Sequence, residues 1–173
     1  MNRRYFLESC ATFGVVAAMS QSLLGCVIAQ NKGRTRADDA APKKIMKSDE
    51  EWKGILSPEQ YYITRQAGTE EPYSSSLLNV HESGTFGCVC CDLPLFSSKT
   101  KFDSHTGWPS FWAPIAKRNV LERIDRSLAE TRTEVLCARC DAHLGHVFDD
   151  GPKPTGLRYC MNGVALKFVK KSS

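Results

Sequence analysis

The sequence predicts a mainly β domain that follows a signal segment and a polar tether. Beyond residue 68, Gly, Pro, Ser or Asn interrupts the chain about every ten residues, and short β-branched or aromatic runs lie between these interruptions. The clearest run, Val164 to Val169, alternates between two faces as a strand does. Two Cys-x-x-Cys pairs predict a metal-binding double knuckle. With 173 residues, 42% hydrophobic and 24% charged, the chain suits one globular domain with appendages.

Residues 1–29 have the features of an export signal. Arg3 and Arg4, followed by Tyr, Phe and Leu, have the form of a twin-arginine signal, and a modestly apolar run extends from Ala11 to Met19. Polar residues at 20–22 interrupt the apolar stretch, so it does not predict a membrane-spanning helix. We therefore expect an exported protein.

Two processing sites compete at the end of this segment. Leu23 to Cys26 resembles a lipobox, in which Cys26 is acylated and becomes the mature N-terminus. Val27 to Ala29 offers a small-residue cleavage site instead. The first alternative predicts a protein anchored in the membrane by a lipid that faces the periplasm, and the second predicts a free periplasmic protein.

A flexible tether is predicted over residues 30–46, which are polar and charged and contain almost no bulky apolar side chains. The folded domain is expected to span residues 47–170. The formal net charge is +4, and much of the positive excess lies in residues 1–53. No stretch interleaves aromatic residues with Lys or Arg, so nucleic-acid binding is not expected.

The run Ser57-Pro58-Glu59-Gln60 predicts the start of a helix. Ser57 is the expected N-cap, Pro58 suits the first helical position, and Gln60 can complete a capping box. The helix is predicted over Pro58 to Arg65, with Gly68 as the stop.

Four cysteines form two Cys-x-x-Cys pairs that are separated by 45 residues: Cys88, Cys91, Cys137 and Cys140. Two such pairs are the usual ligands of a closed tetrahedral zinc site. Disulfides are one alternative in an exported protein. Another is a thioredoxin-like redox pair, although the sequence after Cys140 does not predict the helix that would have to follow such a pair. A third is a local site formed by Cys137, Cys140, His143 and His146.

A further cysteine, Cys160, lies in a strand-like run near the C-terminus. If this run is extended, Arg158, Cys160 and Asn162 share one face. A neighbouring guanidinium lowers the pKa of a thiol, and the thiolate is the nucleophile, so Cys160 is predicted to be reactive. The alternative is a small buried strand cysteine.

Other candidate residues have structural explanations when they are taken singly. His143 and His146 follow the second cysteine pair, and Trp108 lies in a Gly-Trp-Pro-Ser-Phe run that is ordinary core material by itself. Together with the Cys160 face, the histidines indicate a site in which an oxygen is protonated while a thiolate attacks the neighbouring atom.

Several independent motifs in the same order resemble the methionine sulfoxide reductase B family. They are Lys101-Phe102-Asp103-Ser104 with Gly107-Trp108-Pro109-Ser110-Phe111, Gly145-His146-Val147-Phe148 with Asp150-Gly151-Pro152, and Arg158-Tyr159-Cys160-x-Asn162. The match covers residues 48–169. The resemblance implies two antiparallel sheets in a β-tent-like arrangement with short N-terminal helices, one structural zinc ion on the two cysteine pairs, and reduction of methionine-R-sulfoxide.

The resemblance also assigns roles to individual residues. It implies that Cys160 is the nucleophile, that His143, His146, Arg158 and Asn162 surround it, and that Trp108 receives the substrate methyl group. Because the sulfoxide oxygen must be protonated to leave, His146 and His143 are the candidate acids, and Asp150 is a candidate for fixing the tautomer of one ring. The expected product on the enzyme is a Cys160 sulfenic acid.

One position departs from the family pattern. Many members carry a resolving cysteine directly before Gly-Trp-Pro-Ser-Phe, where this chain has Thr106. Once the signal cysteines and the four predicted metal ligands are set aside, Cys90, inside the first cysteine pair, is the one cysteine left in addition to Cys160. We therefore expect an external thiol, from a thioredoxin-like or other dithiol reductant, to return the sulfenic acid to the thiol.

The expected substrate is methionine-R-sulfoxide, either in oxidised proteins or free, and the expected state is a monomer. Two other classes compete with this prediction. One is a non-enzymatic zinc-ribbon module that binds a partner, in which Cys160 is structural. The other is a thiol-dependent reductase of another substrate, such as a peroxide or a disulfide, on the same scaffold.

Overall fold

The computed structural model describes residues 40–172. The twin-arginine segment, Cys26 and residues 30–39 of the predicted tether lie outside this range, so export and lipid anchoring remain predictions. Among the described residues, no helix has both the length and the apolar character needed to cross a membrane. Contacts with the domain begin slightly before the predicted boundary at residue 47, because the Ile45 N–H donates to the Arg139 carbonyl at 2.8 Å.

Two short helices precede the sheets: α1 (Asp49–Ile55) and α2 (Pro58–Gln66). Both begin with a complete capping box, and the one predicted at Ser57 and Gln60 is confirmed. Helix α2 continues one residue past its predicted end. Ala67, at φ 53°, takes the left-handed cap conformation in place of Gly68.

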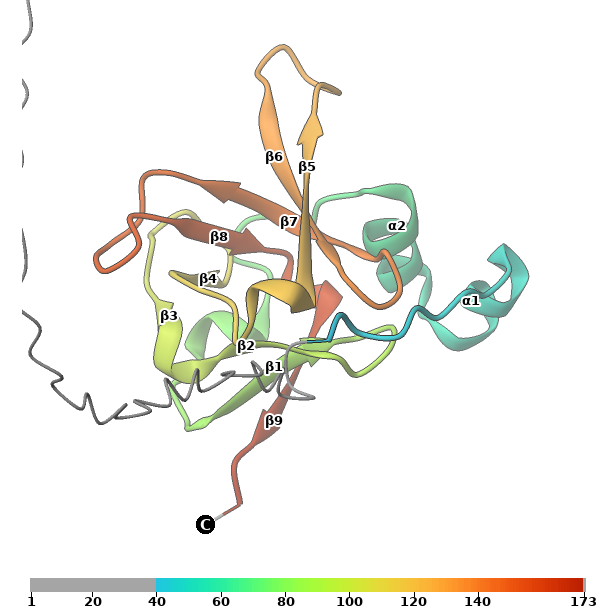
Figure 1. Ribbon diagram of the computed structural model, residues 1–173, viewed down its shortest axis with the longest axis horizontal. Coiled ribbons are helices and arrows are strands. Elements are labelled where there is room, and N and C mark those ends of the chain that lie inside the picture. The colour runs from blue at the N-terminus through green and yellow to red at the C-terminus, as the bar shows by residue number, and fades with distance from the viewer. Residues whose placement is uncertain (1–39, 173) are drawn as a thin grey trace, which may run out of the picture. The chain divides into compact units, whose positions relative to one another are not determined.

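Within residues 40–172, nine strands form two antiparallel sheets, which confirms the predicted mainly β fold (Figure 1). The smaller sheet has the order β2 (Pro94–Ser97), β1 (Gly84–Cys88) and β9 (Leu166–Lys170). The larger sheet has the order β3 (Lys101–Phe102), β4 (Ser110–Phe111), β8 (Arg158–Met161), β7 (His143–Phe148), β6 (Arg132–Cys137) and β5 (Val120–Asp125). The β5–β6 hairpin forms one edge of the larger sheet and projects from the domain (Figure 1).

The C-terminal strand differs from its prediction. Instead of Val164 to Val169, it covers Leu166–Lys170, and Gly163–Ala165 form the 3-10 turn η5. The Glu70 carboxylate explains the turn, because it accepts from the N–H groups of Gly163 at 2.6 Å and Val164 at 2.8 Å. The predicted alternation holds within the strand, where Leu166 is buried and Lys167 is exposed.

Aromatic side chains join the two sheets. The Phe111 ring of β4 lies 5.0 Å from the Phe86 ring of β1 and 4.5 Å from the Phe96 ring of β2. The Tyr159 ring of β8 lies 5.7 Å from Phe96. Side chains alternate along a strand, so burying Phe111 and Tyr159 in this core turns the residues beside them in sequence to the opposite face of the larger sheet.

Candidate active site and metal centre

Cys160 lies on β8, between the neighbouring strands β4 and β7. Its backbone pairs with Ser110 on β4 and with His146 on β7. Residues directly opposite one another in an antiparallel pair place their side chains on the same face. Ser110, Cys160 and His146 therefore share the face of the sheet that lies opposite the aromatic core.

Hydroxyl groups surround the Cys160 sulfur on its β4 side. The Thr106 hydroxyl lies 3.8 Å from Cys160 Sγ. The Ser104 hydroxyl joins this group to the strand, because it lies 2.8 Å from Thr106 Oγ1 and 2.7 Å from Ser110 Oγ. Thr106, which stands where the family that the sequence resembles often has a cysteine, is thus in contact with the Cys160 sulfur, and its own side chain cannot form a disulfide.

Arg158 shares a face with Cys160, as predicted, but its charge is partly compensated. Its guanidinium donates to both Asp150 carboxylate oxygens, at 2.8 and 2.6 Å, and lies 4.3 Å from the centre of the Phe148 ring. The predicted lowering of the Cys160 pKa is therefore not the net result. Burial raises the pKa of the Cys160 thiol and outweighs the opposite effects of Thr106, Arg158 and Ser110.

A β-bulge places both histidines on the Cys160 face. His143 and His146 are three residues apart, so a regular strand would point them to opposite faces. The pairing with β6 shifts between Val135, which is opposite Gly145, and Leu136, which is opposite His143. The extra residue, Leu144, restores a common face. The two imidazole rings lie 5.4 Å apart in an edge-to-face arrangement.

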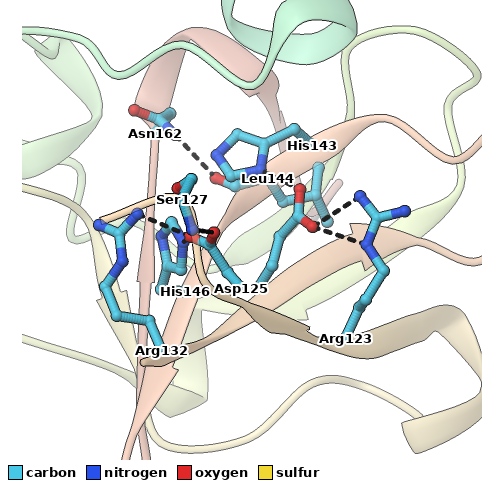
Figure 2. A network of polar contacts seen from close by, with 9 residues as sticks. Arg123, Asp125, Ser127, Arg132, His143, Leu144, His146 and Asn162 are labelled. Atoms are coloured by element: carbon cyan, nitrogen blue, oxygen red, sulfur yellow. Dashed lines mark hydrogen bonds and ion pairs between the residues drawn. The ribbon is translucent and has the colours of Figure 1, made fainter. Parts of the chain in front are cut away.

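Each histidine is bound by a carboxylate of the β5–β6 hairpin, and Figure 2 shows His146 beside Asp125. His146 Nε2 lies 2.8 Å from Asp125 Oδ2, and His143 Nδ1 lies 2.7 Å from Glu134 Oε1. The suggestion that Asp150 fixes a histidine tautomer is therefore wrong, because both oxygens of Asp150 accept from Arg158. The sequence offered only a weak sign of these carboxylates, namely charged residues two apart on a hairpin.

Asn162 supports the bulge and lies beyond the end of β8. The strand ends at Met161, and Asn162 is the N-cap residue of η5 with an extended backbone (φ −64°, ψ 121°). The Asn162 backbone N–H and side-chain amide both donate to the Leu144 carbonyl, at 2.8 and 3.2 Å (Figure 2). Its side-chain oxygen accepts from the Glu70 N–H at 3.0 Å. Asn162 therefore holds the backbone that carries the histidines.

Trp108 is half-buried in the loop that leads into β4. Its indole N–H donates to the Glu70 carbonyl at 3.2 Å, so Glu70 links this loop to Asn162. Gly107 precedes it at φ 95°, where a Cβ would lie 2.7 Å from the Pro72 side chain. Trp108 lines a cavity of about 450 Å³ together with residues of η2 (Ser76–Asn79) and β3. The lining of this cavity includes neither Cys160 nor the two histidines.

The two cysteine pairs come together as predicted. The ligand atoms of Cys88, Cys91, Cys137 and Cys140 all lie within 4.8 Å of one another. The Sγ–Sγ distances of 3.7 Å and 3.5 Å between the pairs are close to the edge of about 3.8 Å of a tetrahedron with metal–sulfur bonds near 2.3 Å. Among the described residues all cysteines are free, which argues against disulfides, and both histidines bind carboxylates rather than this cluster.

The two knuckles repeat the same backbone turn. The Asp92 N–H donates to the Cys88 carbonyl, and the Asp141 N–H donates to the Cys137 carbonyl, each at 2.9 Å. Both aspartates have positive φ, 61° and 57°. The sixth described cysteine, Cys90, is half-buried between two of the clustered residues and does not belong to the cluster. The site can thus hold one tetrahedral metal ion on four thiolates.

Comparison with known proteins gives consistent matches. The SelR domain model matches residues 56–170. A peptide methionine sulfoxide reductase MsrB from Hahella chejuensis is 55% identical over 125 residues, which is 72% of this chain and 90% of the relative. An MsrB from Pseudomonas syringae pv. syringae is 57% identical over 129 residues, 75% of this chain and 98% of the relative.

A plant relative shares the same domain. The chloroplastic peptide methionine sulfoxide reductase B1 of Oryza sativa subsp. japonica is 58% identical over 124 residues, which is 71% of this chain and 58% of the relative. The matched regions contain Cys160, both histidines and both cysteine pairs. The chain therefore belongs to the SelR domain family, the family of the peptide methionine sulfoxide reductases MsrB.

Proposed function

We propose that this protein reduces methionine-R-sulfoxide to methionine, with Cys160 as the nucleophile. The observation that carries the proposal is the position of Cys160, which shares one face of the larger sheet with Ser110 and His146 in a chain of the MsrB family. The relatives are named peptide methionine sulfoxide reductases, which supports methionine sulfoxide as the substrate.

In the proposed reaction the sulfoxide loses its oxygen and Cys160 is oxidised. The Cys160 thiolate attacks the sulfoxide sulfur while His146 or His143 gives one proton to the oxygen, and a second proton from solvent lets this oxygen leave as water. A sulfur–sulfur bond forms and the sulfur–oxygen bond breaks. Water then attacks the Cys160 sulfur and releases methionine. Methionine gains the electron pair, and Cys160 is oxidised to the sulfenic acid.

The surroundings of Cys160 support the attack. Thr106, Arg158 and Ser110 each favour the thiolate, which opposes the rise in pKa that burial causes. Burial in turn keeps the thiolate poorly solvated and thus reactive once it forms. Trp108 is the proposed flat apolar surface for the S-methyl group, and it helps to select one epimer.

Two thiols from an external reductant complete the cycle. The first condenses with the sulfenic acid and releases water, and the second breaks the resulting mixed disulfide and restores the Cys160 thiol. Thr106 supports this route, because it occupies the position next to the sulfur without offering a thiol. A thioredoxin-like dithiol is the proposed donor, and the protein acts as a monomer.

Zinc is the proposed metal on the four clustered cysteines, since it prefers tetrahedral thiolate ligands. The ion is structural when bound, because four protein thiolates leave no position for substrate. The proposed location is the periplasm, free or anchored through lipidated Cys26, with oxidised proteins or free methionine-R-sulfoxide as the substrate.

An assay with separated R and S epimers of a blocked methionine sulfoxide tests the proposal. With a dithiol reductant, the purified protein is expected to convert the R epimer and to leave the S epimer unchanged. Turnover of a peroxide or a disulfide without turnover of either epimer would favour another thiol reductase. Binding of a partner protein without any thiol consumption would favour the zinc-ribbon module.

A further inference from the structure

The β5–β6 hairpin carries four charged side chains whose interactions converge on the two histidines. Arg123 and Asp125 lie on β5, and Arg132 and Glu134 lie on β6. Each carboxylate is shared by one arginine and one histidine. Figure 2 shows Asp125 near Arg132 and His146. The same arrangement therefore occurs twice, once for each ring.

Glu134 forms the more buried pair. Its Oε2 accepts from Arg123 Nε at 3.0 Å and Nη2 at 2.8 Å, and its Oε1 lies 2.7 Å from His143 Nδ1. Glu134 is 5% exposed and His143 is 3% exposed. Because a guanidinium stays protonated, Glu134 is held as an ionised acceptor, and the nitrogen that faces it must carry the proton.

Asp125 forms the second pair with the other ring nitrogen. Its Oδ2 accepts from Arg132 Nη2 at 2.7 Å and lies 2.8 Å from His146 Nε2, and its Oδ1 accepts from the Ser127 N–H at 2.9 Å. Hydrogen bonds from Ser127 and then His146 lower the pKa of Asp125, so this carboxylate is also ionised. His146 must therefore carry its proton on Nε2.

Because the two carboxylates bind different ring nitrogens, the nitrogen that stays free also differs between the two histidines. His146 retains Nδ1, and His143 retains Nε2, which is buried and has no hydrogen-bond partner within residues 40–172. Burial lowers the pKa of His143, so its ring is neutral and Nε2 can only accept a hydrogen bond. A buried acceptor of this kind requires a donor, and the water that the proposed reaction releases is one.

We propose that Asp125 and Glu134 are positioning residues that hold His146 and His143 in opposite tautomers, so that His146 Nδ1 and His143 Nε2 serve the sulfoxide oxygen. After it takes up a second proton from solvent, His146 donates this proton from Nδ1 to the oxygen, and neutral His143 accepts a hydrogen bond at Nε2 from the protonated oxygen or from the water that leaves. This division of labour rests on the proposed function. It explains why two histidines stand on one face although a single acid would suffice for protonation.

The ring tautomers can be measured before any substrate is added. In the full protein labelled with nitrogen-15, NMR is expected to show the proton of His146 on Nε2 and that of His143 on Nδ1. The reverse tautomer at either ring in the wild-type protein would overturn the proposal. This result does not depend on whether the protein reduces methionine sulfoxide, so it separates the two proposals.

Kinetics provide a second test through paired variants. Asp125→Asn is expected to slow single-turnover reduction of the R epimer by about 100-fold with little change in KM, and to shift the pH profile, because the acid loses its orientation. In a His146→Ala background the same substitution is expected to cost less than about twofold, since a residue that acts through His146 has nothing left to position. Independent, multiplicative losses would overturn the proposal.

The pH profile must be assigned against the other groups that face His146. These come from each neighbouring strand: Asp125, Arg132, Glu134, His143 and Cys160. The matched control is Glu122→Gln, because Glu122 lies on the same strand β5 and accepts from the Tyr159 hydroxyl at 3.0 Å rather than from a histidine. It is expected to keep the wild-type rate and pH profile. An equal slowing in Asp125→Asn and Glu122→Gln would indicate a merely structural effect and overturn the assignment.

Discussion

The cysteine knuckles and the Cys160 face are assembled in opposite ways. Each knuckle is local, since a Cys-x-x-Cys pair, one backbone hydrogen bond and one residue with positive φ complete it within five residues. The Cys160 face combines the loop before β4 with strands β8 and β7 and the β5–β6 hairpin. We therefore expect the stability of the knuckles to depend on a bound metal, whereas the Cys160 face depends on correct pairing of distant strands.

The largest expected effect is loss of the fold when a knuckle ligand is removed. Cys88→Ser or Cys140→Ser breaks the four-thiolate cluster, and metal binding in small zinc domains supplies on the order of 10 kcal/mol of folding free energy. Circular dichroism and metal analysis should show an unfolded, metal-free protein.

Cys90→Ser is the matched control for the knuckle variants, because Cys90 lies in the first knuckle outside the cluster. It is expected to remain folded with one zinc ion per chain. A Cys88→Ser protein that is metal-free, folded and active would contradict the view that this region depends on its metal.

The next largest effect is expected in the second region, the Cys160 face, when Cys160 itself is replaced. Cys160→Ser should abolish turnover and leave the fold and zinc content unchanged, because the residue is proposed as the nucleophile and does not belong to the metal cluster. Turnover of the R epimer, melting temperature and zinc content check this together. More than a trace of turnover in the serine variant would rule out the mechanism.

The difference between the two regions also explains what the sequence could predict. The spacing of the cysteines predicted the metal cluster, and the Ser57 capping box predicted α2, because both are local patterns. Asp125 and Glu134 were missed, since only the pairing of β5, β6 and β7 brings them to the histidines. The net rise in the Cys160 pKa was missed as well, because burial depends on tertiary packing.

Replacing the proposed acid should have a smaller effect than replacing the nucleophile. His146→Ala is expected to slow the sulfoxide step by roughly 100- to 10,000-fold with little change in fold, the range for a lost general acid. Thiol consumption in a single turnover measures this rate. His105→Ala, at an exposed histidine paired with Asp103, is the control and should be silent. An unchanged rate in His146→Ala would move the role to His143.

A still smaller effect is expected from the hydroxyl beside the nucleophile. Burial raises the pKa of the Cys160 thiol. The rate of Cys160 alkylation should therefore continue to rise at pH values above the pKa of a free cysteine thiol. Thr106→Val removes a group that favours the thiolate, so the same rise should move to higher pH, with about 3- to 10-fold slower alkylation at pH 7.

Mass spectrometry of the labelled peptide checks the effect of Thr106→Val. The control is Thr100→Val, because the Thr100 hydroxyl donates to the Ser97 and Ala113 carbonyls and not to Cys160. If Thr106→Val and the wild-type protein give the same pH profile, the hydroxyl does not contribute to the reactivity of Cys160.

The smallest expected effect is the loss of one free thiol per chain during a single turnover. The number of thiols lost tests whether Cys90 of the first knuckle forms a disulfide with Cys160. A disulfide requires Cα atoms within about 7 Å, and Cys90 lies between the clustered cysteines Cys88 and Cys91, so it should not reach Cys160 unless its knuckle moves. The zinc-loaded protein trimmed of Cys26 should show two free thiols before reaction, Cys90 and Cys160. After one turnover without reductant it should show one, with a sulfenic acid that a dimedone-type reagent traps at Cys160. Two lost thiols and a peptide that links Cys90 to Cys160 would instead make the knuckle part of the catalytic cycle, because Cys90 would then be the resolving residue.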